Sequence, residues 1–172
     1  KVKGAEARYE SHRGYIRNLE TYLRTGEYLD MFWGEYAHQL DSKGRLIIPS
    51  RLRDKLTDDA ILTRGLDHNL VIYPASTWKN VTTQLNEMPI THPTARALRR
   101  LLFSGAVEIS LDKQGRVNIP NYLLEYASIE DSILLVGMET FIELWQPDQW
   151  RTTLDNVAAV LAESDHLLTL NV

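Results

Sequence analysis

The sequence predicts an α+β fold made of two tandem β-β-α-β-β-α units that pair within one chain as an internal pseudo-dimer. The main observation is a repeat, because LDSKGRLIIP at 40–49 returns as LDKQGRVNIP at 111–120. The similarity continues downstream, after a one-residue insertion in the second repeat, with three matched pairs: Ile61 and Ile133, Gly65 and Gly137, and Trp78 and Trp150. A collinear repeat of this length indicates a duplicated structural unit.

The first unit spans 31–88 and opens with a strand, a turn and a return strand. Tyr36, His38 and Leu40 alternate along the chain and share one strand face. The sequence DSKG at 41–44 is typical of a tight turn, because its Asp accepts backbone hydrogen bonds and its Gly tolerates a positive φ. The return strand at 45–48 leads to Pro49, which fits the first position of a short helix over 50–56.

The rest of the first unit is predicted to be a hairpin and a helix. Apolar segments at 60–63 and 70–73 flank Gly65, as the two strands of a hairpin do. The helix that follows has an apolar stripe at helical spacing: Trp78, Val81, Leu85 and Met88.

A linker at 89–105 is predicted to be a helix from about 93 to 103 that Gly105 ends. The second unit, 106–163, repeats the first, with a strand through Val107 and Ile109, a turn at 112–115 and a return strand at 116–119. Pro120 then opens a short helix, and segments 133–136 and 141–145 form the second hairpin. Its last helix has a predicted apolar stripe of four residues: Trp150, Leu154, Val157 and Leu161.

The two ends of the chain stand apart from the repeats. Residues 1–30 are polar, and Ile16, Leu19 and Leu23 have the spacing of a short amphipathic helix near 14–25. Met31 resembles a start residue, so the alternative is a start-site extension; no function is assigned to this segment. Residues 164–172 are read as a short tail.

Composition excludes several classes of protein. The chain has no cysteine, which excludes disulfides and thiolate metal sites and fits a reducing cytoplasm. Its apolar runs are too short to span a membrane, and 1–30 lacks the apolar centre of a signal peptide. The net charge is −4, so a nucleic-acid surface would have to be a local basic patch.

The sequence carries no catalytic signature. It lacks the glycine-rich phosphate and dinucleotide loops and the nucleophile elbow of hydrolases. The five histidines are scattered without metal-ligand spacing: His12, His38, His68, His92 and His166. We therefore expect a protein that is not an enzyme and that has no metal or cofactor.

The repeated Asp-x-x-x-Arg motif has two interpretations. In the structural one, Asp41 and Asp112 close their turns and pair with Arg45 and Arg116, while Gly44 and Gly115 supply the positive φ; these are the turn residues of the motif. In the functional one, the turn presents Lys43 at its tip and Arg45 at its base to a nucleic acid.

Basic residues concentrate after the first turn. Lys43, Arg45, Arg51 and Arg53, with Lys55 nearby, form a candidate DNA-binding surface. The second repeat keeps Lys113 and Arg116, but it has Tyr122, Leu123 and Leu124 in place of the first repeat's 51–53. The sequence therefore predicts a division of labour, in which the first half touches DNA and the second completes the fold or builds subunit contacts.

A third basic group lies on the linker helix, where Arg96, Arg99 and Arg100 share one face opposite three leucines. This group is either a stripe that faces solvent or a subunit interface, or it is a secondary DNA contact. Lys113 has the same alternatives: an interface residue or a secondary DNA contact. Trp78 and Trp150 occupy equivalent places and are expected to be core or interface anchors.

Six short motifs follow one another along the chain: MFxGEY at 31–36, LDSKGRLIIP at 40–49, TRGLD at 63–67, IYP at 72–74, LFSG at 102–105 and LDKQGR at 111–116. In this order and spacing they resemble the MraZ family, the bacterial transcriptional regulators of the division and cell-wall gene cluster. The resemblance covers about 31–150. The chain departs from the family pattern at Leu124, where relatives often carry Arg, and at Asn118, where they carry an apolar residue.

The resemblance implies two swapped-hairpin (SpoVT-AbrB-type) units fused into one intrachain pseudo-dimer barrel with flanking helices. It also implies ring-like homo-oligomers that bind double-stranded DNA at short direct repeats in the promoter of their own operon, hence a cytoplasmic protein at the nucleoid. The alternative is an antitoxin-like protein-interaction module. Such antitoxins carry a disordered acidic tail, and residues 164–172 are too short and apolar for one.

Overall fold

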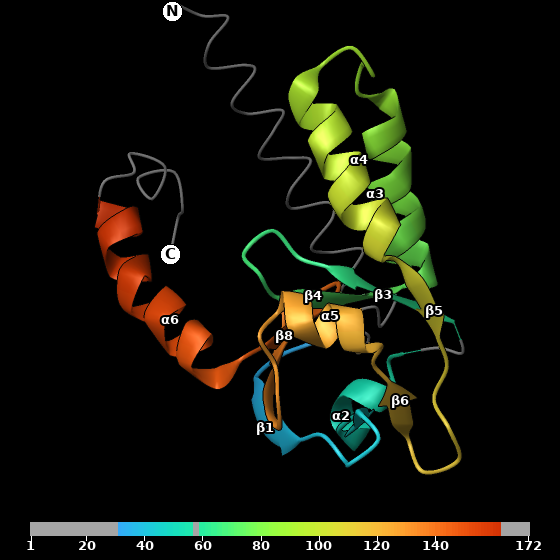
Figure 1. Cartoon of the computed structure of the whole chain (residues 1–172), viewed down its shortest axis with the longest axis vertical. Coiled ribbons are helices and arrows are strands. Elements are labelled where there is room, and N and C mark those ends of the chain that lie inside the picture. Colours follow the sequence, from blue (N-terminus) through green and yellow to red (C-terminus); the bar gives the residue numbers. More distant parts are fainter. Residues whose placement is uncertain (1–30, 57–58, 163–172) are drawn as a thin grey trace, which may run out of the picture. The chain divides into compact units, whose positions relative to one another are not determined.

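The computed structural model describes residues 31–56 and 59–162, and the side chains up to residue 157 (Figure 1). The predicted helix near 14–25, the tail at 164–172 and the side chain of Leu161 lie outside these residues.

The strands of the larger sheet are antiparallel and run in the order β1-β7-β8-β4-β3-β5. Their bounds are β1 Glu35–Gln39, β3 Ala60–Arg64, β4 Leu70–Pro74, β5 Val107–Ile109, β7 Ser132–Gly137 and β8 Ile142–Trp145. The two hairpins, β3–β4 and β7–β8, are those that the sequence predicts. The strands at the ends of the order are β1 and β5, so this sheet is open.

The pairing exchanges strands between the two halves of the chain. Strand β1 of the first repeat pairs with β7 of the second, and β5 of the second repeat pairs with β3 of the first. Strand β4 pairs with its own counterpart, β8. Each hairpin therefore receives its outer strand from the other repeat, and neither half has a complete sheet alone.

A two-stranded sheet joins the halves a second time. Strand β2 (Arg45–Ile47) pairs antiparallel with its counterpart β6 (Arg116–Asn118). The short helices α2 (Ser50–Arg53) and α5 (Asn121–Tyr126) follow these strands. One apolar cluster, including the fully buried Leu46, Leu123 and Leu135, packs the small sheet, both short helices and the larger sheet together.

Two details of the short helices differ from prediction. Pro49 and Pro120 lie just before the first helical residue rather than at it. Helix α2 ends at Arg53, short of the predicted 50–56. The first difference follows from the extended backbone of each proline (ψ 141° and 139°), which continues the preceding strand.

The helices α3 (Ala75–Glu87) and α4 (Pro93–Gly105) form a hairpin that lies against the sheet (Figure 1). Trp78 lies between the two, with its ring edge-on to Phe103 and close to Tyr73 of β4. Its predicted role as an anchor is confirmed, as is the linker helix.

Helix α6 (Pro147–Ala162) follows β8 as α3 follows β4. Trp150 packs on Trp145, with ring centroids 5.4 Å apart, over a small apolar cluster on β7. The next two residues of the predicted stripe are not buried, since Leu154 is 44% and Val157 38% exposed. The reason is an asymmetry between the halves: α4 covers α3, whereas no helix of the described residues covers α6.

Within the part of the chain that the structure describes, no helix has both the length and the apolar character needed to cross a bilayer.

Because the strands are exchanged, we expect the folded chain from residue 31 onward to unfold as one cooperative unit. Tryptophan fluorescence and far-UV circular dichroism should give coincident urea transitions. The tryptophans report on both halves, since Trp78 lies in the first and Trp145 and Trp150 in the second. Two separated transitions would show that the halves fold independently.

Candidate nucleic-acid interface

The first turn is organised by the carboxylate of Asp41. Its Oδ1 accepts hydrogen bonds from the backbone N–H groups of Lys43 (2.9 Å) and Arg45 (3.0 Å). Its Oδ2 accepts from the Arg45 side chain, at 2.7 Å from Nε and 2.6 Å from Nη2. One acid therefore closes the turn and fixes the guanidinium at its base.

The second turn repeats this arrangement. Asp112 Oδ1 accepts from the N–H groups of Gln114 (2.8 Å) and Arg116 (3.0 Å). Its Oδ2 lies 2.8 Å from Nε and 2.7 Å from Nη2 of Arg116. The structural interpretation of the Asp-x-x-x-Arg motif is confirmed in both halves.

The glycine of each turn adopts a left-handed backbone, with φ of +70° at Gly44 and +73° at Gly115. A residue with a Cβ is strained there by about 1–2 kcal/mol. This geometry exposes the tip residues Lys43 and Lys113 to solvent, while Arg45 and Arg116 are half-buried.

The electrostatics of the two acids reflect their partners. The hydrogen bond from the Arg45 side chain is the main cause that lowers the pKa of Asp41 to about 2, and Arg116 does the same for Asp112. Both carboxylates are therefore ionised, and both pairs formed, throughout the neutral and mildly acidic range.

Each turn is also tied to the other half of the chain. The N–H of Ile48, after β2, donates to the carbonyl of Gly115 at 2.9 Å. Reciprocally, the N–H of Ile119 donates to the carbonyl of Gly44 at 3.1 Å. These bonds continue the β2–β6 pairing, so the two turns are fixed relative to each other.

Arg53 does not lie at the turn of its own repeat. Its Nε and Nη2 donate to the carbonyl of Ile48, at 3.3 and 3.0 Å. A Cβ built on Gly115 would overlap its guanidinium, coming within 2.6 Å of Nη1. Arg53 therefore covers Gly115, in the second turn, whereas Arg51 is exposed on α2.

The second half shows the reciprocal contact. Leu124, which stands where the first repeat has Arg53, lies against Gly44 of the first turn, with its Cδ1 3.7 Å from a Cβ built there. The sequence places Arg53 with the first turn, but the exchange of strands brings each short helix to the turn of the other repeat. The sequence does show that positions 53 and 124 are equivalent in the two repeats, and these are the two positions that contact the turn glycines.

The linker-helix arginines have structural partners. Arg99 donates from Nη2 to the carbonyls of Leu85 (2.7 Å) and Met88 (3.2 Å), at the end of α3. Arg96 donates from Nη1 to Ile90 (3.0 Å) and Thr91 (2.7 Å) in the connection between the helices. Both satisfy carbonyls that a helix end and a loop leave unpaired. Arg100 is exposed, and a DNA role for this group stays a prediction.

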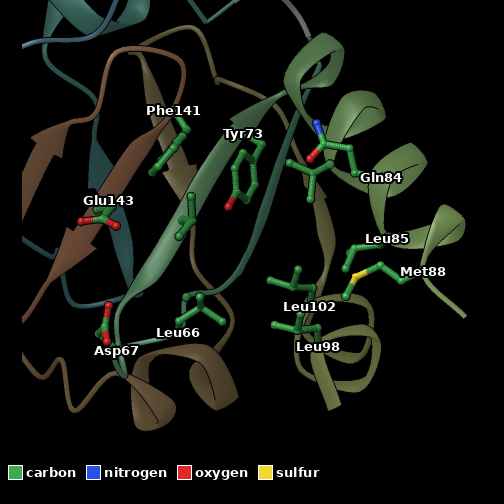
Figure 2. Close-up of a pocket in the computed structure, with 13 residues that line it drawn as sticks. Leu66, Asp67, Tyr73, Gln84, Leu85, Met88, Leu98, Leu102, Phe141 and Glu143 are labelled. Atoms are coloured by element: carbon green, nitrogen blue, oxygen red, sulfur yellow. The ribbon is translucent and has the colours of Figure 1, made fainter. Parts of the chain in front are cut away.

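A cavity of about 440 Å³ lies between the α3–α4 hairpin and the sheet (Figure 2). Its walls include Leu85 and Met88 of α3, Leu98 and Leu102 of α4, and Tyr73 of β4. Asp67 and Glu143 lie toward the same end of it. Burial raises the pKa of Glu143, although the Trp145 indole N–H donates to its carboxylate at 2.9 Å. Sequence reasoning did not find this cavity, because its apolar residues read as ordinary core.

The fold and the site together define a class: an α+β protein of two tandem units, each with a basic turn that is held by an Asp–Arg salt bridge. The family model described as "MraZ protein, putative antitoxin-like" matches this chain twice, over residues 31–101 and 102–170. The chain belongs to the MraZ family, as its motifs predict.

Curated relatives agree with this assignment. A protein of Herpetosiphon aurantiacus named transcriptional regulator MraZ is 48% identical over 128 residues, which cover 74% of this chain and 90% of the relative. The protein of that name from Clostridium acetobutylicum is 52% identical over 120 residues, covering 70% and 84%. That from Carboxydothermus hydrogenoformans is 42% identical over 133 residues, covering 77% and 93%.

The lowered pKa values of Asp41 and Asp112 predict a loss of stability in acid. A carboxyl whose pKa is depressed by folding stabilises the fold above its unfolded pKa, and this contribution disappears as the pH falls through the folded value. We expect the free energy of unfolding to fall between pH 4 and pH 2, and to fall less in the double variant Asp41→Asn, Asp112→Asn.

Urea unfolding at several pH values measures this difference. Asp148→Asn is the charge control, since Asp148 belongs to an exposed helix pair with Arg151 rather than to a turn. An equal acid-induced loss in wild type and double variant would contradict the assignment.

Proposed function

We propose that this chain is a transcriptional regulator that binds double-stranded DNA through its two turns and the adjacent basic helix, without enzymatic activity. The observation that carries this proposal is the pair of basic turns, each fixed by an Asp–Arg pair and tied to the other. The names of the relatives, which describe transcriptional regulators, support it.

The chemistry of the turns suits a DNA backbone. The exposed ammonium groups of Lys43 and Lys113 are mobile point charges of the kind that neutralise phosphates. Arg45 and Arg116 are held in one orientation by their acids, as an arginine must be to read a base edge. Lysines supply affinity in this proposal, and arginines supply specificity.

The family resemblance suggests where the chain binds. We propose that its sites are short direct repeats in the promoter of the division and cell-wall gene cluster, including its own operon. A protein with this role works in the cytoplasm, at the nucleoid.

We propose further that the two halves are swapped-hairpin units fused into a pseudo-dimer. The exchange of β1 and β5 between the hairpins supports this, and so does the pairing of β2 with β6 and of β4 with β8. The described strands form an open sheet and a small second sheet, so a closed barrel finds no support in them.

Homo-oligomerisation, in a ring according to the family resemblance, would raise the affinity of these small turns. Avidity of about 10² to 10⁴ is available when several linked sites engage repeated DNA elements together. The exposed Leu154 and Val157 of α6 are consistent with a subunit contact. Light scattering gives the subunit count directly.

An antitoxin-like protein-interaction module is the alternative function. The description of the matching family as antitoxin-like is the observation that supports this alternative. It predicts a stable complex with a partner protein and no salt-dependent affinity for DNA.

Arg45→Ala should abolish specific binding to a duplex carrying the sequence upstream of the gene for this chain. Losing one arginine contact to a base costs about 1–3 kcal/mol per site, and an oligomer multiplies the loss. Fluorescence anisotropy at two salt concentrations, against a scrambled duplex, measures the effect.

Arg45→Lys is the matched control for charge, because it keeps the cation and loses the planar fork. It should retain non-specific binding and lose preference for the upstream sequence. A folded Arg45→Ala protein that binds this duplex as the wild type does would refute the role of Arg45.

A further inference from the structure

The short basic helix α2 belongs, in space, to the second turn. Arg53 covers Gly115 and binds the carbonyl of Ile48, whose own N–H donates to Gly115. A single residue, Ile48, therefore connects the guanidinium to the second turn through two backbone bonds. The equivalent residue at the first turn is Leu124, which is buried and uncharged.

The exchange makes the surroundings of the two turns unequal. The second turn has Lys113 at its tip, Arg116 at its base and Arg53 against its glycine. The first turn has Lys43 and Arg45, but α5 brings the uncharged Leu124 to its glycine. An acidic residue follows in both repeats, Asp54 after Arg53 and Glu125 after Leu124, so the two surroundings differ by the charge of Arg53. Positive charge is therefore concentrated at the second turn, contrary to the order of the sequence.

We propose that Arg53 is a positioning residue for the second turn, and that this turn is the stronger phosphate-contacting surface of the protein. The inference rests on the proposed DNA-binding function, and it reverses the division of labour that the sequence predicts. Arg53 acts in two ways: it holds the turn in its binding geometry before DNA arrives, and it adds a cation beside Lys113.

A reciprocal exchange tests this proposal, with each substitution copied from the equivalent position of the same chain. Arg53→Leu gives the second turn the leucine that lies at the first turn, and Leu124→Arg gives the first turn the arginine that lies at the second. We expect Arg53→Leu to weaken binding to the upstream duplex at least several-fold and to reduce the slope of log K against log salt by about one. Arg151→Leu removes an exposed cation from α6 and should change neither.

Coupling between residues separates positioning from general charge. In the wild type, Lys113→Ala should weaken binding more than Lys43→Ala. In the Arg53→Leu background the effect of Lys113→Ala should shrink, while that of Lys43→Ala stays the same. If Arg53 had only a structural role, Arg53→Leu would change the effects of Lys113→Ala and of Lys43→Ala on binding by the same factor.

A pair of glycine variants gives an independent test that keeps Arg53 in the chain. Gly44→Ala and Gly115→Ala carry similar backbone strain, since both glycines have a φ near +70°. Only the Cβ at 115 would displace the Arg53 guanidinium, whereas that at 44 meets its nearest atoms at 3.5 and 3.7 Å. Gly115→Ala should therefore weaken DNA binding more than Gly44→Ala, with both variants compared at a temperature at which circular dichroism shows them folded.

The outcomes are distinct. A folded Arg53→Leu protein with wild-type affinity and salt slope overturns the inference, and so does a larger loss from Lys43→Ala than from Lys113→Ala. If Arg53→Leu does not fold, the glycine pair decides, and equal affinities of the two alanine variants overturn the inference. Wild-type protein without salt-dependent affinity for the duplex would overturn the proposed function together with it.

Discussion

The structure depends on the reciprocal backbone bonds between the two turns. Ile48 donates to Gly115, and Ile119 donates to Gly44, so each turn is completed by a strand of the other repeat. The same exchange recurs in the larger sheet, where β1 and β5 cross to the opposite hairpins. A buried backbone group must find a partner, and among the described strands four of the six pairings join the two repeats. The duplication therefore forms one structural unit, with strands shared between the repeats.

The Asp–Arg pairs act on geometry more than on stability. Exposed ion pairs contribute little to the free energy of folding, and Asp41 and Asp112 are only partly shielded from water. Their other bonds, to backbone N–H groups, fix the shape of each turn, and their bonds to Arg45 and Arg116 fix where the guanidinium lies. A binding surface that is organised before its ligand arrives loses less entropy on binding.

Much of the fold could be predicted from the sequence because its signals are local. The turn at 41–44, the hairpins and the linker helix depend on glycine, proline and apolar periodicity within a few residues. The partner of each strand is not local information, so the placement of Arg53 at the second turn could not be derived from its position after Arg45. The exposure of Leu154 could not be predicted for a similar reason, because periodicity shows an apolar face without showing what covers it. The sequence therefore predicts the Asp–Arg pairs of the two turns but not the place of Arg53 at the second turn, and the DNA-binding role of these residues stays a prediction.

The most direct measurement of this account is an NMR titration of the protein with the duplex from upstream of its gene. The amide signals of both turns, 41–45 and 112–116, and of α2 should shift together in a salt-dependent way, with the larger changes at 112–116. Signals of α6 and of the α3–α4 hairpin should move only if assembly changes. Shifts absent from both turns, or confined to α6, would contradict a DNA interface built from the interlocked turns.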